Sequence, residues 1–411
     1  MAPGTRPVRP GAARPELSAV FAATFFVRFA FGITVAVFAA YLTHRSTGLS
    51  GSDVGTAGLV SALAPVGEFS TVLFSGTAAD RWGRFPVLFA GIGGAALLFV
   101  WIATTRAVPT LGAANLLFGV ASGAILAASL AVVADRAGAD ERGFEMGRFD
   151  AVNLFGWIAG VAFGLGVEGV LPNSELGLVF VAGTAILVLG LAVSGLILRG
   201  RPKRRAPPAF AFRRIVRAAF RRPVLMVTLP WLVIYSLLGT ALAFLSDAAA
   251  GIGIRSTYLA LAIAAGGSVL VVSQPYFGRL ADRAGRTRMM TVGTGGFVLV
   301  LLGASLLARY GVDVPALVVV GVGVALALAY GPAALAALAD LAVEQGRATT
   351  MAIYSLTISL GMVVGLVAST GLYGRFGTDG LYPYFGGIAV VLVAFTAIRW
   401  TEARRATIPA R

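Results

Sequence analysis

The sequence predicts an all-α membrane protein, with twelve transmembrane helices in two pseudo-symmetric six-helix bundles. Three observations lead to this fold class. The chain of 411 residues is 58% hydrophobic and only 12% charged, which lies outside the usage of soluble globular proteins. Twelve apolar runs are long enough to cross a bilayer, which takes about 20 residues of helix. A charged motif recurs at an offset of 202 residues, so the two halves are expected to repeat.

The apolar runs are interpreted as helices because they are long and lack the alternation of strands. Only Thr104, Thr105, Arg106 and Pro109 separate the third run from the fourth. The expected spans are 17–41, 53–79, 85–105, 108–134, 150–171, 176–198, 224–246, 256–280, 288–308, 314–339, 348–373 and 381–400. They predict an N-terminal bundle over 1–198, a basic linker over 199–222 and a C-terminal bundle over 223–411.

The distribution of charge predicts the orientation in the membrane. The formal net charge is +15, yet the odd-numbered loops hold only five of the 33 Lys and Arg residues. By the positive-inside rule, both termini are expected in the cytoplasm of a multi-pass protein of the cell membrane, and no nucleic-acid partner is expected. Residues 199–222 carry ten basic side chains and no acidic one, which suits a cytoplasmic linker in contact with anionic lipid.

Two segments of the chain occur twice. Residues 76–88 read GTAADRWGRFPVL, and residues 278–290 read GRLADRAGRTRMM. A second set repeats at an offset of 205 residues, from the end of the fourth and tenth spans into the fifth and eleventh. Its members are Asp135, Arg142, Met146, Phe149, Gly156 and Gly160, which match Asp340, Arg347, Met351, Tyr354, Gly361 and Gly365. Two matches at nearly one offset support two related halves.

These features together resemble the major facilitator superfamily. The resemblance covers essentially the whole chain: the twelve spans, the basic central loop and the pattern G-x-x-x-D-R-x-G-R after the second and eighth spans. It implies two six-helix bundles around a central cavity, with alternating access as the halves rock about a midplane site. The expected partners are a small-molecule substrate, protons and the lipid bilayer. A monomer is expected, without cofactor or metal.

The repeated hairpins are expected to control opening on the cytoplasmic side. Glycine permits a tight turn, and a carboxylate at a helix end can meet a facing helix N-terminus or an arginine. We expect Arg84 to pair with Asp135, with an equivalent pair in the second half, so that the outward-open state is stabilised. The alternative is that the hairpins only fix topology. The expected gating residues are Gly76, Asp80, Arg81, Gly83, Arg84, Asp135, Arg142, Gly278, Asp282, Arg283, Gly285, Arg286, Asp340 and Arg347.

Two ionisable residues fall deep inside spans. Arg28 and Glu68 each lie eleven residues from the expected cytoplasmic end of their span, so at about 1.5 Å per residue their depths are similar. Burying such a charge alone costs on the order of 2.5–3.5 kcal/mol. The two are therefore expected to face the central cavity, each other or both. Three roles stay open: proton coupling at Glu68, binding of a substrate anion by Arg28, or a structural ion pair.

The C-terminal half has no matching charge, since Leu270 takes the position of Glu68 in the repeat. We therefore expect the N-terminal half to carry coupling and the other half to supply surface for the substrate. Pro230, Pro275 and Pro332 are expected to free backbone carbonyls and kink their spans. The candidate polar residues of the substrate cavity are Asn115, Tyr235, Gln274, Tyr330, Ser355 and Ser359.

The chain departs from the family pattern in two places. Many members carry an arginine in the fourth span where Asn115 stands here. The pattern of proton-coupled exporters in the fifth span, G-x-x-x-G-P-x-x-G-G, is half present, because Val161 replaces the proline and Leu165 the last glycine. These departures weaken the prediction of export without removing it. Asp150 and Asn153 stand at the cytoplasmic start of that span, where they could reach the cavity or cap the helix; capping is the favoured expectation.

The sequence therefore predicts a secondary active transporter of a small organic solute, coupled to protons, with efflux of amphipathic or drug-like compounds slightly favoured. The alternatives are an uptake symporter or passive facilitator for a sugar or organic anion, and a transport-inactive sensor or assembly subunit. An enzyme is not expected: the sequence has no cysteine, no metal-ligand cluster and no glycine-rich phosphate loop with its lysine. Its single histidine, His44, falls in an outer loop.

Overall fold

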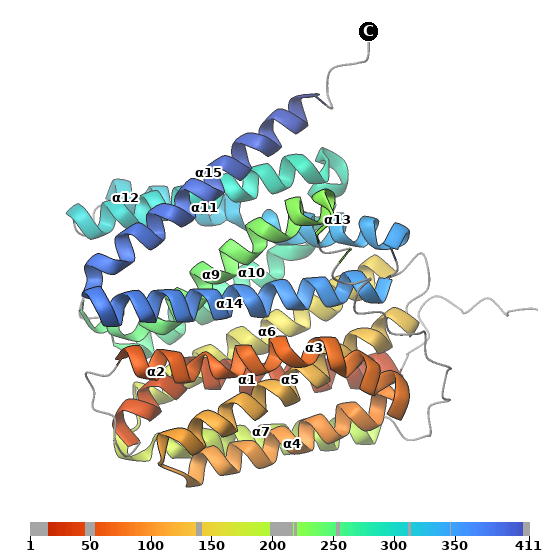
Figure 1. Ribbon diagram of the computed structural model, residues 1–411, viewed down its shortest axis with the longest axis vertical. Coiled ribbons are helices and arrows are strands. Elements are labelled where there is room, and N and C mark those ends of the chain that lie inside the picture. Colours follow the sequence, from red (N-terminus) through yellow and green to blue (C-terminus); the bar gives the residue numbers. More distant parts are fainter. Residues whose placement is uncertain are drawn as a thin grey trace, which may run out of the picture.

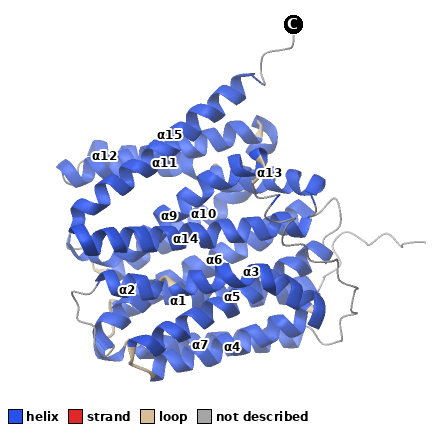
Figure 2. Ribbon diagram, viewed as in Figure 1, coloured by secondary structure: helices blue, strands red, loops and turns tan. Residues whose placement is uncertain are grey.

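The computed structural model describes residues 15–45, 54–136, 142–197, 217, 220–251, 255–310, 314–345 and 347–405. Within these ranges the regular elements are helices (Figure 2). The α-helices are α1 (Pro15–Arg45), α2 (Val54–Ser61), α3 (Leu63–Trp82), α4 (Arg84–Thr104), α5 (Val108–Arg136), α6 (Arg142–Glu168), α7 (Gly177–Ile197), α9 (Arg222–Gly251), α10 (Ser256–Ala284), α11 (Arg286–Tyr310), α12 (Val314–Ala327), α13 (Tyr330–Gln345), α14 (Arg347–Phe376) and α15 (Leu381–Arg405).

The helices follow the expected spans. Within the described ranges, eleven helices are long and apolar enough to cross a membrane. The second expected span is not among them, because it is divided at Ala62 into α2 and α3. The tenth is divided at residues 328–329, between α12 and α13, and still counts as one apolar stretch. The chain is therefore a multi-pass, all-α membrane protein, as predicted.

Each of the two divided spans has a proline just after the division. Pro65 and Pro332 each follow a division by a few residues, and neither has an N–H for the carbonyl four residues earlier. Pro230 and Pro275, in contrast, lie inside the uninterrupted helices α9 and α10. Of the three proline kinks expected from the sequence, only the one at Pro332 accompanies a break in the helix.

The helices form two groups. Figure 1 shows α1–α7 in the lower part of the molecule and α9–α15 in the upper part. The groups meet where α14 packs against α2 and α3, and where α6 packs against α10. Buried apolar side chains form one core that is drawn almost wholly from α1–α7 and another drawn from α9–α14. The two-bundle fold is thus confirmed, while the boundaries at 198 and 223 stay a prediction.

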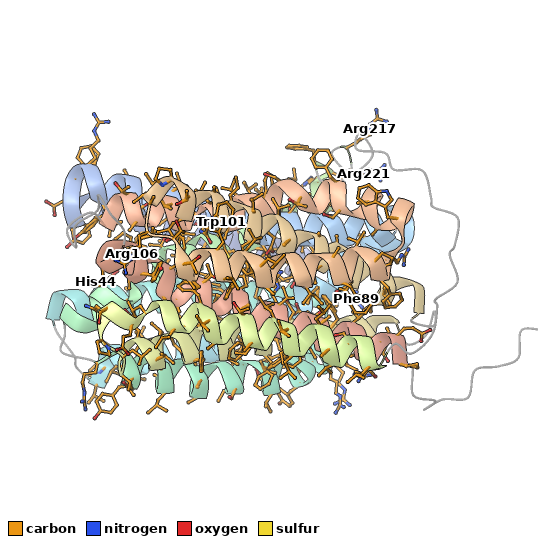
Figure 3. All side chains as sticks on the ribbon, turned by 90° about the horizontal axis from the view of Figure 1, so that it is seen from below. His44, Phe89, Trp101, Arg106, Arg217 and Arg221 are labelled. Atoms are coloured by element: carbon orange, nitrogen blue, oxygen red, sulfur yellow. The ribbon has the colours of Figure 1, made fainter. Side chains whose placement is uncertain are left out.

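The helices run between two ends of the molecule. We call the end at which α7 ends and α9 begins the linker end, and the opposite one the far end. Figure 3 shows Arg217 and Arg221 at one end, and His44 and Arg106 at the other. The linker end is the one that the distribution of charge predicts to be cytoplasmic.

Close helix pairs built on glycine repeat in the two groups. A Cβ at Gly160 in α6 would lie 2.0 Å from the carbonyl oxygen of Phe29 in α1, and a Cβ at Gly365 in α14 would lie 2.1 Å from that of Ser236 in α9. Such an approach requires a residue without a Cβ. The pair α1–α6 is therefore equivalent to the pair α9–α14, in agreement with the offset of 205 residues in the sequence.

Candidate functional site

The two charges predicted inside the membrane are in direct contact. The guanidinium of Arg28 in α1 donates two hydrogen bonds to the carboxylate of Glu68 in α3, from Nη1 to Oε2 and from Nη2 to Oε1, both at 3.0 Å. Arg28 is 7% exposed and Glu68 is 3% exposed. A bidentate pair of this kind is directional as well as electrostatic. The two residues therefore neutralise each other where either alone would be costly to bury.

Three further side chains satisfy the pair. The Nε of Arg28 donates to Oδ1 of Asn153 in α6 at 2.6 Å, and Ser122 in α5 donates to Oε2 of Glu68 at 2.9 Å. Ser359 in α14 donates to Oε1 of Glu68 at 3.2 Å. Because α14 belongs to the second group of helices, the carboxylate of Glu68 is bound from both halves of the molecule.

Glycines in the neighbouring helices make room for this arrangement. A Cβ at Gly156 in α6 would lie 3.1 Å from the Cβ of Arg28, and a Cβ at Gly123 in α5 would lie 2.8 Å from the carbonyl oxygen of Glu68. Both helices thus approach the pair closely enough for their polar side chains to reach it. Gly156 of the fifth span therefore helps to build the site, because it lets α6 approach Arg28 closely.

A second contact joins the halves nearer the linker end. The hydroxyl of Tyr354 in α14 donates to Oδ1 of Asp150 in α6 at 2.6 Å, and both residues are buried. The expectation that Asp150 and Asn153 cap their helix is wrong. The helix begins at Arg142, because it continues through a polar turn that hydropathy alone assigned to the preceding loop. Both residues lie well inside it.

Aromatic rings pack around this second contact. The ring centre of Trp231 in α9 lies 4.9 Å from that of Tyr354, 6.1 Å from that of Tyr330 and 6.5 Å from that of Tyr235. Trp231, Tyr330 and Tyr354 belong to the apolar core of the second half, and Tyr235 packs against it. The side of the site formed by α9, α13 and α14 is therefore aromatic rather than charged.

Tyr235 holds in the second half the position of Arg28 in the first. A Cβ at Gly361 in α14 would lie 2.7 Å from the Cβ of Tyr235, just as a Cβ at Gly156 would meet that of Arg28. The equivalence follows an offset of 207 residues, which the hairpin offset of 202 does not reveal. The sequence therefore identified Tyr235 as a candidate, but did not reveal that Tyr235 is equivalent to Arg28 in the repeat.

The other cavity candidates of the second half lie apart from the ion pair. The hydroxyl of Tyr330 donates to the carbonyl of Val227 at 2.8 Å. Gln274 lies beside Gly331, with its Oε1 3.6 Å from where a Cβ would stand. The side chain of Ser355 lies outside the described part of the structure. Among the described candidates of this half, Ser359 is the one that hydrogen-bonds Glu68.

Asn115 supports the divided second span. Its Nδ2 donates to the carbonyls of Val60 at 3.1 Å and Ser61 at 3.2 Å, and the residue is fully buried. Because Pro65 has no N–H to offer the Ser61 carbonyl, the amide supplies the missing donor. The structure thus gives Asn115 a packing role, and its place in a substrate cavity stays a prediction.

The two hairpins have the same backbone. Each turns at the second glycine of its motif, where Gly83 has φ of 98° and Gly285 has φ of 93°. The arginine that follows donates to a backbone carbonyl four residues before the expected aspartate partner. These contacts are Arg84 to Ala131 and Arg286 to Ala336. Gly76 and Gly278 lie inside α3 and α10, and Arg283 is exposed at the end of α10.

The predicted ion pairs of the hairpins stay predictions. The side chains of Asp80, Arg81, Asp135, Arg142, Asp340 and Arg347 lie outside the part of the chain that the structure describes. The described pair is Asp282 with Arg286, at 3.6 Å between Oδ1 and Nη2. It joins residues one turn apart across Gly285, at the surface.

Sequence reasoning did not include four members of the central network among the candidate site residues: Ser122, Asn153, Asp150 and Tyr354. Ser122 carried no signal, because serine in a span commonly bonds its own helix backbone. Asp150 and Asn153 carried a signal, since Asp150, Asn153 and Gly156 follow one another at intervals of three residues. That spacing sets all three on the face of α6 that approaches α1.

The arrangement joins the two halves through hydrogen bonds to carboxylates. A carboxylate held by an arginine in one half and a hydroxyl in the other changes its partners when it takes up a proton. Among the described side chains, two hydrogen bonds cross between the halves, Ser359 to Glu68 and Tyr354 to Asp150. Both start on α14 and both end on a carboxylate.

Solved structures similar to this one are membrane transporters. The human organic anion transporter MFSD10 (TETRAN) is 19% identical, with a TM-score of 0.67 over 93% of this chain and 99% of that one. A POT family transporter in complex with 5-aminolevulinic acid is 12% identical, with a TM-score of 0.75 over 95% and 96%. A POT family transporter in complex with a thioalcohol conjugated peptide is 13% identical, with a TM-score of 0.73 over 95% and 96%. At these identities the likeness is one of fold.

The sequence also matches a family model along its length. The model of the Major Facilitator Superfamily matches residues 20–326 and, in a second match, residues 236–410. The chain therefore belongs to the major facilitator superfamily of membrane transporters, and the resemblance seen in its hairpins is confirmed.

Proposed function

We propose that this member of the major facilitator superfamily is a secondary active transporter that moves a small organic solute by alternating access, with Glu68 as the proton-carrying group. The observation that carries the proposal is the carboxylate of Glu68, bound by Arg28 at 3.0 Å and by Ser359 of the other half at 3.2 Å. A buried ionisable group inside the membrane is a functional candidate by default.

Proton uptake at Glu68 would change both contacts in one step. The neutral carboxyl no longer attracts Arg28 as an anion does, and the guanidinium is released toward Asn153. The hydroxyl of Ser359 loses a charged acceptor, which weakens a bond between the halves. Loss of the proton restores both contacts. The protonation state of Glu68 thus sets how firmly α14 is held to the first half.

The proposed transporter lies in the cell membrane with the linker end in the cytoplasm, and it works as a monomer with the hairpins gating that side. Efflux of amphipathic or drug-like compounds is slightly favoured over uptake. The support is for the kind of solute: the aromatic surface of α9 and α14 beside a site with few charges suits an apolar compound. A passive facilitator would have the same fold and would differ in making no use of the proton.

A ligand screen against the purified protein at pH 6 and pH 8 tests the proposal. Sugars, carboxylates, amino acids and lipophilic cations are compared by thermal shift, since a ligand at 100 times its dissociation constant stabilises by about 2.7 kcal/mol. We expect a ligand whose affinity depends on pH in the wild type and not in Glu68→Gln. Glu175→Gln, which alters an exposed carboxylate in the loop after α6, serves as the matched control and keeps the wild-type response.

Flux measured in proteoliposomes completes the test. A pH gradient should drive accumulation of that ligand by the wild type, whereas Glu68→Gln should only equilibrate it. An identical pH response in the wild type and Glu68→Gln would remove Glu68 from coupling, and a wild type that never accumulates the ligand would make the protein a facilitator.

A further inference from the structure

We propose that Asp150 binds the positive charge of a protonated amine on the transported solute, and that the amine takes the place of the Tyr354 hydroxyl. This inference rests on the proposed transport function and names its substrate class. Asp150 is 8% exposed and lies in α6, eight residues from the start of the helix. The oxygen that the amine would bind is Oδ1, which now accepts from Tyr354 at 2.6 Å.

One carboxylate of the site has no described cation in contact with it. Both terminal nitrogens of Arg28 are committed to Glu68, and its Nε is committed to Asn153. Arg28 still attracts Asp150 electrostatically, but the two side chains, both of which the structure describes, form no ion pair. Among the described side chains, no cation lies within ion-pair distance of Asp150. Among the side chains that the structure describes, the central network thus holds two carboxylates and one guanidinium, and a cationic solute would complete it.

The surroundings of Asp150 suit an amine on an apolar skeleton. Trp231 lies with its ring centre 4.9 Å from that of Tyr354, and Tyr235 lies beside both. An ammonium group near a carboxylate and an aromatic face gains from ion pairing and from the ring quadrupole together. A carboxylate solute would instead meet the excess negative charge of Asp150 and be disfavoured.

Replacing the Tyr354 hydroxyl links substrate binding to movement. Among the described residues, the bond from Tyr354 to Asp150 is one of two side-chain hydrogen bonds between the halves, and the other depends on Glu68. A bound amine breaks the first of these bonds, and a proton on Glu68 weakens the second. Substrate and proton would then act on the same helix, α14, through separate carboxylates.

Three compounds with one skeleton test the inference: 4-phenylbutylamine, 4-phenylbutanol and 4-phenylbutyrate, with dissociation constants measured at pH 7 for the full chain in detergent. We expect the wild type to bind the amine at least about tenfold more tightly than the alcohol or the carboxylate. Asp150→Asn should remove that preference and leave the affinity for the alcohol unchanged. Tyr354→Phe should tighten the amine severalfold, because the hydroxyl that competes for Asp150 is gone.

Matched variants separate this inference from proton coupling. Tyr384→Phe removes another tyrosine hydroxyl, which bonds Ser236 and Thr240 rather than a carboxylate, and should leave amine binding unchanged. Glu68→Gln should keep the preference for the amine while losing accumulation driven by pH. If Glu68→Gln instead accumulates solute normally, proton coupling at Glu68 fails and the amine site stands. No preference for the amine in the wild type, an unchanged preference in Asp150→Asn, or weaker amine binding in Tyr354→Phe would each overturn the inference.

Discussion

The two halves of the molecule share a backbone framework and differ in what they carry on it. Gly156 and Gly160 bring α6 against α1, and Gly361 and Gly365 bring α14 against α9 in the same way. On the first framework stands Arg28, bonded to Glu68 and Asn153. On the second stands a tyrosine packed among aromatic rings.

This difference shows that the same helix packing can carry different chemistry. Close helix approach depends on the absence of a Cβ, so the glycines must repeat wherever the helix pair repeats. A charge inside the membrane must be matched or removed, and in the first half Arg28 is matched by Glu68. The aromatic half then supplies neutral hydroxyls, from Tyr354 and Ser359, to the carboxylates of the charged half.

The largest expected loss of stability comes from removing Arg28 from its ion pair with Glu68. Arg28→Met leaves the Glu68 carboxylate buried without its cation, and removing one partner of a buried pair costs about 3–5 kcal/mol. Tyr235→Phe, at the equivalent position, loses one hydroxyl and should cost about 1 kcal/mol. The measurement is the free energy of unfolding in a denaturing-detergent titration.

The double variant Arg28→Met with Glu68→Gln is the control for this experiment. Since no unpaired charge is left, it should recover most of the stability that Arg28→Met loses. Equal losses of unfolding free energy in Arg28→Met and Tyr235→Phe would contradict the view that only the first of these equivalent positions carries a buried charge that must be paired.

The architecture was predictable from sequence because its signals are local. A run of apolar residues, a glycine before an arginine or an excess of basic residues in alternate loops can each be read along the chain. The break at Ala62 was missed because it depends on Pro65 together with Asn115 from another helix. Hydropathy detects a span, but it does not reveal which side chains from other helices donate hydrogen bonds to its backbone carbonyls.

The candidate site was predictable only in its charges. Arg28 and Glu68 were found because a charge in an apolar run is conspicuous, and their shared depth followed from helix geometry. Ser359 was named as a cavity candidate and Ser122 was not, and neither contact with Glu68 was predicted, because both join residues far apart in the chain. Asp150 was misjudged for a simpler reason: the start of α6 was set too late, so an interior carboxylate was taken for a cap.

A smaller effect is expected from filling the glycine framework. Gly160→Ala would set a Cβ 2.0 Å from the Phe29 carbonyl oxygen, and Gly365→Ala would set one 2.1 Å from that of Ser236. Overpacking of this kind costs about 1–3 kcal/mol. We expect the two variants to lose similar stability in the same detergent titration, because this is the part of the molecule that the halves share.

Gly94→Ala in α4 is the matched control for both glycine variants. A Cβ there would meet no atom within 4 Å, so the variant should be as stable as the wild type or slightly more stable, since alanine favours the helix. A loss confined to Gly160→Ala would mean that the halves differ in packing as well as in charge.

The smallest expected change in stability lies in the hairpins, where the halves are alike again. Asp282 is mostly exposed, and its ion pair with Arg286 spans 3.6 Å, so Asp282→Asn should cost less than about 1 kcal/mol.

The proposed role of Asp282 is instead to favour one state of the cytoplasmic gate. Label pairs across the linker end, measured by spin-label distances, should therefore shift in population in Asp282→Asn and in the equivalent Asp80→Asn. A hairpin that only fixes topology would leave those populations as they are in the wild type. A shift from one hairpin alone would mean that function has diverged even where the motif has not.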